Sequence, residues 1–351
     1  MKQRIRNLDT FRAIAAIVVM IGHIELFRQN NLGQSLFGIV PSGHTAVMMF
    51  FVISGFLISF LLTKEKEKYG QIVLKDFYLR RIFRIWPVYY LVLITSYFLF
   101  FTPPSCKTIV FAITILPNVS HILQCGWSTS PQIWSIGVEN LFYIFFPFVI
   151  MFIRKERIPL VLILFIIGYA VLPHVIAFTN VRTLQNETLE TINNKFFYCN
   201  KFDSLAIGCL IGHLYATKSH CLKFLYNKIV FAICTILAIV CWGGNIELQH
   251  FNDEFMSVLF AVVILNVCTN DELHINIENE VTKFLGKISY GMYMYHWIVL
   301  LLAFKIFPLT DSVGSTVILY SFVIGVTILC AWISFETYEK FFLNIKKRFE
   351  R

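Results

Sequence analysis

Long apolar runs, repeated along almost the whole chain, constrain what this sequence can fold into more than any other feature. An α-helix needs about 20 apolar residues to cross a lipid bilayer. Ten runs reach or approach that length, near residues 8–27, 44–63, 85–101, 133–153, 158–178, 202–217, 229–244, 255–269, 284–306 and 313–337. Because 57% of the residues are hydrophobic and only 15% are charged, little polar sequence is left for a soluble domain. We predict an all-α integral membrane protein of about ten transmembrane helices, with residues 1–351 forming one membrane domain.

The lysines and arginines between these runs predict the orientation of the chain. Cytoplasmic loops are enriched in Lys and Arg, and ten spans with both termini in the cytoplasm place 24 of the 30 basic residues inside. An eleventh run, 108–123, is interrupted by Pro117 and Asn118. A full crossing there would move the basic loops that follow to the outside, so we expect a re-entrant or broken segment on the outer side. Lipid cannot satisfy its free backbone groups, so this segment predicts a cavity or a buried site.

Composition excludes several other classes of protein. The net charge of +9 follows from the loop orientation and from attraction to anionic lipid head groups, so nucleic acid is not expected as a partner. The nine cysteines include no Cys-x-x-Cys pair, so neither a disulfide framework nor a metal site is predicted. The first apolar run carries Arg12 and His23 and lacks a cleavage site of small residues, which indicates a retained helix rather than a signal peptide.

Two ionisable residues lie within the first predicted span. Arg12 and His23 are eleven positions apart, which is close to three full helical turns, so they share one face about 16 Å apart. Ionisable residues inside a membrane are costly and are functional candidates by default. The alternative is structural, with Arg12 reaching the inner head groups and His23 bonding a neighbouring helix.

Two further short motifs carry charge next to or inside apolar runs. Arg81 and Arg84 share a helical face and offer two guanidinium forks suited to phosphate, although a lipid anchor beside the membrane is the alternative. Ser135 and Glu139 lie one turn apart at the outer start of the fourth run. A carboxylate at that depth needs a partner, so Glu139 is either functional or structurally paired, for example with His44.

Small and aromatic residues form two stripes that are typical of helix packing. Residues 50–59 place Gly55 inside an apolar helix, which allows a neighbouring helix to approach closely. Ser289, Tyr293 and His296 follow the spacing of one helical face. Each stripe is a candidate for lining a cavity, and core packing is the alternative.

Taken in this order, the motifs resemble the acyltransferase 3 family of integral membrane acyltransferases. The resemblance covers essentially the whole chain and is carried by Leu8-Asp9-x-x-Arg12 with His23, the block from Phe50 to Ile58, Arg81-x-x-Arg84 before Pro87, Trp134-Ser135-x-x-x-Glu139, and the block from Tyr293 to Trp297. It implies transfer of an acyl group, most often acetyl, from cytoplasmic acyl-CoA to a hydroxyl on the far side of a bacterial cytoplasmic (inner) membrane. The acceptor it implies is a surface carbohydrate such as O-antigen, capsule or exopolysaccharide, or its lipid-linked precursor. Some members of that family carry a fused hydrolase-like domain, and because this sequence ends shortly after its last predicted span we expect a stand-alone form.

The resemblance and the chemistry together assign roles to these residues. Transfer to a hydroxyl needs a base, and histidine is the side chain best matched to neutral pH. We therefore expect His23 to be the base and Glu139 to orient its imidazole, as the third member of a catalytic triad does. The residues expected to bind the phosphates of CoA are Arg12, Arg81 and Arg84. Trp134, Ser135, Tyr293 and His296 are expected to line the cavity.

A transporter or flippase for polysaccharide or lipid-linked sugar is the main alternative, since it also combines many spans with buried charges. Such proteins commonly contain repeats, and no internal repeat is visible in this sequence. A purely structural membrane subunit is a third possibility. The longest polar loop, 179–201, is expected outside and is the best candidate for touching an external acceptor.

Overall fold

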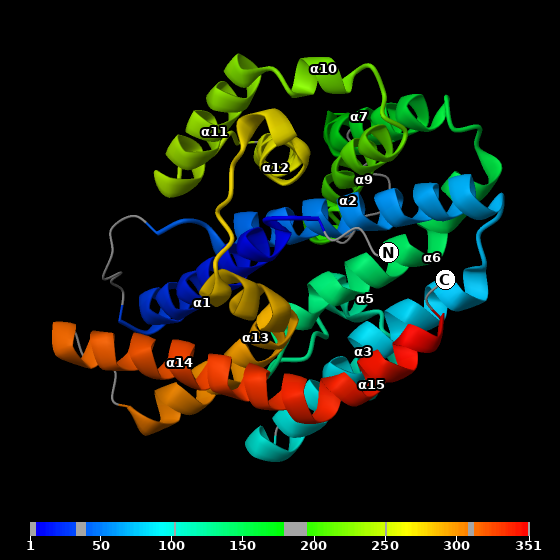
Figure 1. The fold of residues 1–351 in the computed structure, drawn as a ribbon. Coiled ribbons are helices and arrows are strands. Elements are labelled where there is room, and N and C mark those ends of the chain that lie inside the picture. The colour runs from blue at the N-terminus through cyan, green and yellow to red at the C-terminus, as the bar shows by residue number, and fades with distance from the viewer. Residues whose placement is uncertain are drawn as a thin grey trace.

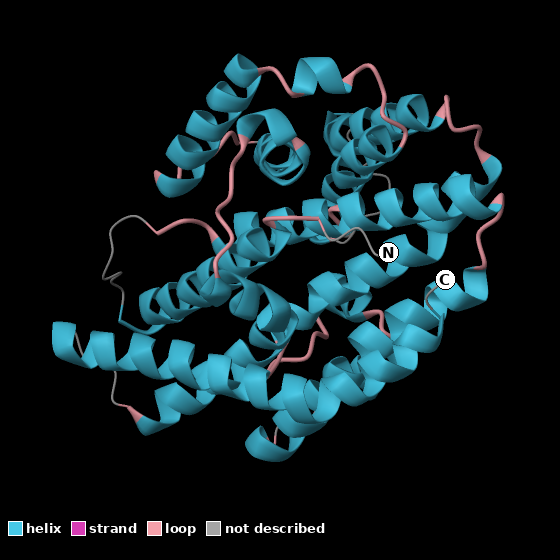
Figure 2. Cartoon of the chain, in the orientation of Figure 1, coloured by secondary structure: helices cyan, strands magenta, loops and turns pink. Residues whose placement is uncertain are grey.

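The computed structural model describes residues 5–32, 40–101, 103–178, 195–249, 251–307 and 312–349. Within these residues every regular element is a helix (Figure 2), which confirms the all-α class. The longer helices are α1 (Leu8–Leu32), α2 (Gly43–Tyr69), α3 (Leu74–Phe100), α6 (Trp134–Phe152), α7 (Ile158–Phe178), α9 (Phe202–Ala216), α11 (Lys228–Gly243), α12 (Asn252–Thr269), α13 (Glu280–Ile306) and α14 (Val313–Ser334). The short ones are α4 (Cys106–Ile113), α5 (Pro117–Ile122), α10 (Leu222–Leu225) and α15 (Lys340–Lys346). Most of the loop expected at 179–201 lies outside the described residues.

Each of the ten apolar runs coincides with one of the longer helices. Among the described residues, seven helices are long and apolar enough to cross a membrane: α1, α2, α3, α6, α7, α12 and α14. The other three are α9, α11 and α13. Helices α9 and α11 have only 15 and 16 residues, and α13 carries charged and hydroxyl side chains along its first half. A membrane protein with several candidate spanning helices is thus confirmed, and α13 is a long helix in which polar residues are concentrated.

The interrupted run at 108–123 is broken in the structure, as predicted. It forms α4 and α5, and the carbonyl groups at the end of α4 accept hydrogen bonds from two buried or half-buried tyrosines. The Tyr89 hydroxyl donates to the Ala112 carbonyl at 3.0 Å, and the Tyr90 hydroxyl donates to the Ile113 carbonyl at 2.7 Å. The protein therefore satisfies backbone groups that lipid would leave unpaired.

Helices α3 and α6, which flank the broken segment, run in opposite directions. Tyr78, near the start of α3, donates to the carbonyl of Ile144 in the second half of α6 at 2.9 Å. Lys66, near the end of α2, donates to the carbonyl of Ile150 at 2.6 Å. The segment between α3 and α6 thus leaves and returns at the same end of the bundle, as the distribution of lysines and arginines predicted.

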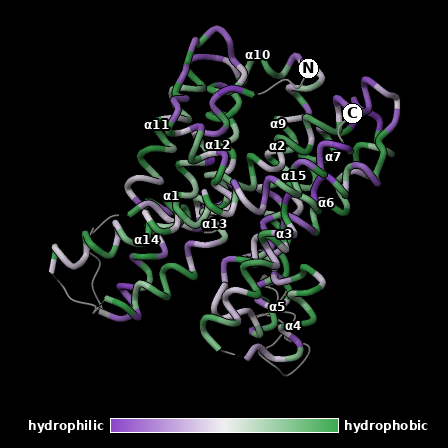
Figure 3. Tube along the Cα trace, turned by 60° about the horizontal axis from the view of Figure 1, so that its bottom comes forward, coloured by the Kyte–Doolittle hydropathy of each residue, from purple (hydrophilic) through white to green (hydrophobic). Residues whose placement is uncertain are grey.

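Helix α2 lies at the centre of the bundle and is buried over most of its length, whereas α7 and α14 bury little of their surface. Helix α2 packs against α1, α6, α9 and α12, while α13 lies between α1 and α14 (Figure 1). Hydrophobic residues are spread along the helices, and hydrophilic residues gather in the loop beside α10 (Figure 3). The polar side chains that remain inside this apolar bundle are therefore the informative ones.

Glycines allow α2 and α9 to cross closely. A Cβ atom on Gly55 would overlap the Leu205 carbonyl oxygen, and one on Gly208 would overlap the Val52 carbonyl oxygen. The close packing expected around Gly55 is confirmed, and its partner helix is α9. This crossing holds the central helix in place.

We predict that Gly208→Ala destabilises the protein by about 1–3 kcal/mol, because the added methyl group pushes against backbone. Gly168→Ala on α7 is the matched control, since nothing lies within 4 Å of the Cβ position there. In a helix, Ala is favoured over Gly by up to about 1 kcal/mol, so the control keeps or slightly gains stability. Thermal unfolding of both variants in detergent checks this, and equal stability would contradict the close crossing.

Candidate active site

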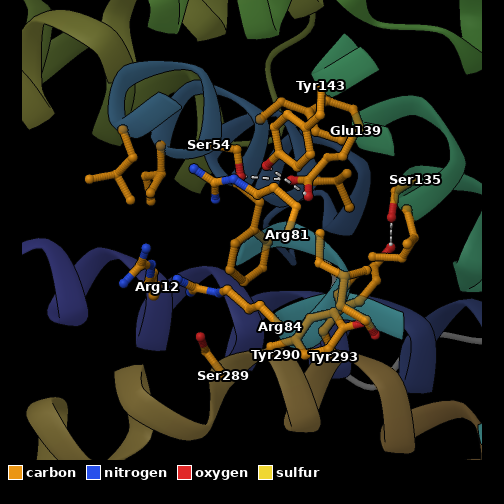
Figure 4. Close-up of a pocket in the computed structure, with 17 residues that line it drawn as sticks. Arg12, Ser54, Arg81, Arg84, Ser135, Glu139, Tyr143, Ser289, Tyr290 and Tyr293 are labelled. Carbon is orange, nitrogen blue, oxygen red and sulfur yellow. Dashed lines mark hydrogen bonds between the residues drawn. The ribbon is translucent and has the colours of Figure 1, made fainter. Parts of the chain in front are cut away.

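One cavity collects most of the polar side chains that the sequence singled out. It has a volume of about 90 Å³, several times what one water molecule requires. Helices α1, α2, α3, α6 and α13 surround it. The polar side chains that line it are Arg12, Ser54, Arg81, Arg84, Ser135, Glu139, Tyr143, Ser289, Tyr290 and Tyr293 (Figure 4).

Three guanidinium groups lie on one side of this cavity. The Arg12 guanidinium forms an ion pair with Asp9 at 3.2 Å, and the side chains of Arg12 and Arg84 extend toward each other (Figure 4). Arg81 lies 5.0 Å from the ring centroid of Tyr143, in a cation–π contact. Within the described part of the chain, neither Arg81 nor Arg84 forms an ion pair or hydrogen bond. Adjacent cations that form no direct ion pair favour an anionic ligand.

Glu139 faces these arginines from α6. Its carboxylate accepts hydrogen bonds from the Ser54 hydroxyl at 2.7 Å and from the Tyr143 hydroxyl at 3.3 Å. The predicted pairing of Glu139 with the His23 imidazole is wrong, because the described hydrogen bonds direct Glu139 to Ser54 and Tyr143. Glu139 instead offsets part of the positive charge of the cavity.

The hydrogen-bond partner of His23 is His296, on α13. Their Nδ1 and Nε2 atoms are 2.9 Å apart, and the rings are within 12° of parallel. Nδ1 of His296 lies 2.5 Å from the Tyr293 carbonyl oxygen. A carbonyl oxygen only accepts, so His296 carries its proton on Nδ1 and accepts at Nε2. His23 must therefore donate from Nδ1, which leaves the lone pair of its Nε2 free to accept a proton.

The pair formed by His23 and His296 lies next to the cavity, and Tyr293 separates the pair from the cavity. The Tyr293 ring lines the cavity, and its centroid is 5.7 Å from that of His296. Its hydroxyl is 2.7 Å from the Ser135 hydroxyl oxygen and donates to the Gln132 carbonyl at 2.9 Å. In space, the Tyr293 side chain thus lies between the guanidinium groups of the cavity and the imidazoles of the histidine pair.

The predicted site residues are partly brought together. Arg12 and His23 do share one face of α1, since Arg12 lines the cavity beside Ser289 of α13, and His23 bonds His296 of the same helix. Of the four residues expected to line the cavity, Ser135 and Tyr293 do so. Trp134 and His296 do not line this cavity, because the Trp134 side chain packs near His44 and His296 lies behind Tyr293.

The sequence reasoning missed two contributors to the site. Tyr143 follows Glu139 by four residues, so it lies on the same helical face, and that spacing was a usable signal. Ser54 lies in the 50–59 stripe, which was a candidate for lining a cavity, but it was not singled out as a site residue. No local pattern connects Ser54 on α2 with Glu139 on α6.

The sequence of this chain is similar to known acyltransferases over almost its whole length. A family model described as an acyltransferase domain matches residues 5–336. Peptidoglycan O-acetyltransferase OatA of Listeria monocytogenes is 25% identical over 341 residues, covering 88% of this chain and 51% of that protein. O-acetyltransferase OatA of Staphylococcus aureus is 24% identical over 369 residues, covering 95% of this chain and 56% of that protein. The chain spans about half the length of these curated relatives. No solved structure matches it.

Proposed function

Because the chain belongs to the acyltransferase 3 family, we propose that it is a membrane O-acyltransferase that moves an acyl group, in the simplest case acetyl, from acyl-CoA to a hydroxyl of a carbohydrate. One observation carries the proposal: the arginine-lined cavity reaches Tyr293, whose ring packs against His296, and His296 is hydrogen-bonded to His23 so that His23 Nε2 carries a lone pair and no proton. A donor with phosphates fits one end of this arrangement, and an alcohol that must lose a proton fits the other.

The proposed reaction uses groups of this chain alone. Arg12, Arg81 and Arg84 hold the CoA phosphates, and the thioester arm extends toward Tyr293, which moves aside with Ser135. His23 Nε2 accepts the proton of the acceptor hydroxyl while the oxygen of that hydroxyl forms a bond to the thioester carbonyl carbon. The tetrahedral intermediate then breaks its C–S bond. The proton passes from His23 to the leaving sulfur, so the products are an ester and the free CoA thiol.

The orientation of the chain extends the proposal to the two sides of the membrane. The arginine end is cytoplasmic in this account, since the loops near it hold most of the lysines and arginines. The acceptor then approaches from the outer side, as a surface polysaccharide would. Since one relative is named for peptidoglycan, peptidoglycan joins O-antigen, capsule and exopolysaccharide as an acceptor class to test.

Purified protein incubated with acetyl-CoA labelled in its acetyl group tests the proposal. The acceptor is the de-O-acetylated surface carbohydrate of the host strain, with its peptidoglycan as a separate sample. We expect label in an alkali-labile ester on one of these fractions. No ester in any fraction, together with label-independent movement of the glycan in vesicles, would favour a transporter instead.

His296 is expected to position His23, which predicts a graded effect. His296→Leu removes the acceptor that fixes the His23 tautomer, so kcat falls by part of the about 10²- to 10⁴-fold that a general base contributes, while the half-saturating donor concentration stays unchanged. His296→Gln retains an amide oxygen that can accept from His23 and recovers part of kcat. Equal losses in the two variants, or a change confined to donor affinity, would show that His296 does not act through His23.

A further inference from the structure

A second polar cluster lies outside the arginine-lined cavity, where α2, α9 and α12 begin. Nε2 of His44 is 3.1 Å from the Asp253 carboxylate, and the Lys201 ammonium is 2.8 Å from the same oxygen. The exposed fractions of these side chains are 23% for His44, 11% for Asp253 and 12% for Lys201. Burial lowers the pKa of Lys201, but nearby carboxylates, led by Asp253, outweigh it and raise the pKa overall. The cluster therefore holds a fixed ion pair with an imidazole attached.

Four aromatic rings lie in series beside this ion pair. The Tyr198 and His44 centroids are 5.0 Å apart at 8°, those of His44 and Trp134 are 6.2 Å apart at 17°, and those of Trp134 and His121 are 6.4 Å apart at 28°. The Tyr198 side chain is 58% exposed. We call these four rings, with Asp253 and Lys201, the aromatic platform. It can be reached from the surface of the protein.

The aromatic platform adjoins both parts of the candidate active site. A Cβ on Gly22 would lie 3.0 Å from the backbone nitrogen of Gly43, so α1 and α2 are in close contact at these two glycines. His23 follows Gly22, and His44 follows Gly43. Trp134 immediately precedes Ser135, which lines the cavity. The platform is therefore joined to the candidate active site through neighbouring residues on α1, α2 and α6.

We propose that the aromatic platform is the acceptor subsite and binds a pyranose ring of a carbohydrate. This proposal rests on the proposed function. The C–H bonds on one side of a pyranose form an apolar face that packs on the negative face of an aromatic ring. Hydroxyl groups at its rim find charged partners, since an ammonium has three donors and the Asp253 carboxylate can accept from a hydroxyl group. Aromatic faces with a few fixed polar groups give orientation and specificity.

Acceptor saturation measures the role of the platform. In the labelled acetyl-CoA assay, with the host strain's de-O-acetylated surface carbohydrate as the acceptor, Trp134→Leu should raise the half-saturating acceptor concentration about tenfold. The half-saturating concentration of acetyl-CoA should not change. Trp134→Phe keeps a ring face and should recover most of the acceptor affinity. Trp332→Leu, which removes a 45% exposed indole on α14, is the control and should leave both values unchanged.

Tyr198→Ala provides a test that does not disturb the core, because that ring is largely exposed. It should also raise the half-saturating acceptor concentration, by a smaller factor. Unchanged acceptor saturation in both Trp134→Leu and Tyr198→Ala overturns the proposal. So does a His44→Ala variant that loses kcat with unchanged acceptor saturation, which would make His44 and Asp253 a catalytic pair. If the wild-type protein transfers no label, the proposed function itself is contradicted, and that outcome is distinct from a failure of the platform proposal alone.

Discussion

Replacing His23 with alanine is expected to reduce acyl transfer by about 10²- to 10⁴-fold, the usual contribution of a general base. The variant loses the Nε2 lone pair that the His296 hydrogen bond leaves free. The half-saturating concentration of acetyl-CoA should stay within a factor of about two, because the guanidiniums that we propose bind the donor are on the other side of Tyr293. Initial rates of label transfer, measured on purified protein, give both values.

His220→Ala is the matched control for His23→Ala. His220 is an exposed histidine in the turn before α10, so its removal should not affect transfer. Yield and thermal unfolding of the two variants should match the wild type. A folded His23→Ala protein with the wild-type rate would remove His23 from the mechanism.

Neutralising Arg81 and Arg84 together is expected to raise the half-saturating acetyl-CoA concentration by about 10²- to 10⁴-fold. Each hydrogen bond to a charged group contributes about 1.5–3 kcal/mol, and within the described part of the chain neither guanidinium forms an ion pair or hydrogen bond that would otherwise use it. The variants are Arg81→Gln and Arg84→Gln, singly and combined. Arg84→Lys keeps the charge but loses the fork geometry, so it should fall between the wild type and Arg84→Gln.

Arg154→Gln, in the exposed turn after α6, is the control for charge alone and should leave donor saturation unchanged. The half-saturating acceptor concentration should be the same in all of these variants, because the arginines and the aromatic platform lie at different ends of the site. A double variant with unchanged donor saturation would contradict the assignment of the cavity to the donor.

Local spacing in the sequence predicted the parts of the site that lie on single helices. The interval between Arg12 and His23 placed both on one face of α1, and the interval between Ser135 and Glu139 placed both on the cavity side of α6. The break at 108–123 was predictable too, because proline and asparagine interrupt an apolar run that must still satisfy its backbone groups.

Pairings between helices could not be predicted in the same way. His23 bonds His296 across 273 positions, and His44 meets Asp253 across 209 positions. Such contacts depend on which helices pack side by side, and helical periodicity carries no information about the partner helix. The misplaced role of Glu139 has this cause, since its position on the cavity side of α6 followed from local spacing but its neighbour Ser54 on α2 was unknown.

Transfer across a sealed membrane tests the central claim, that donor and acceptor meet from opposite ends of one site. The protein is reconstituted into vesicles with de-O-acetylated host carbohydrate trapped inside, and labelled acetyl-CoA is added outside. Neither molecule crosses lipid, so only proteins whose arginine end faces outward contribute. We expect labelled ester on the trapped carbohydrate, and its loss in the His23→Ala variant. Label that reaches only carbohydrate supplied on the same side as acetyl-CoA would contradict the account.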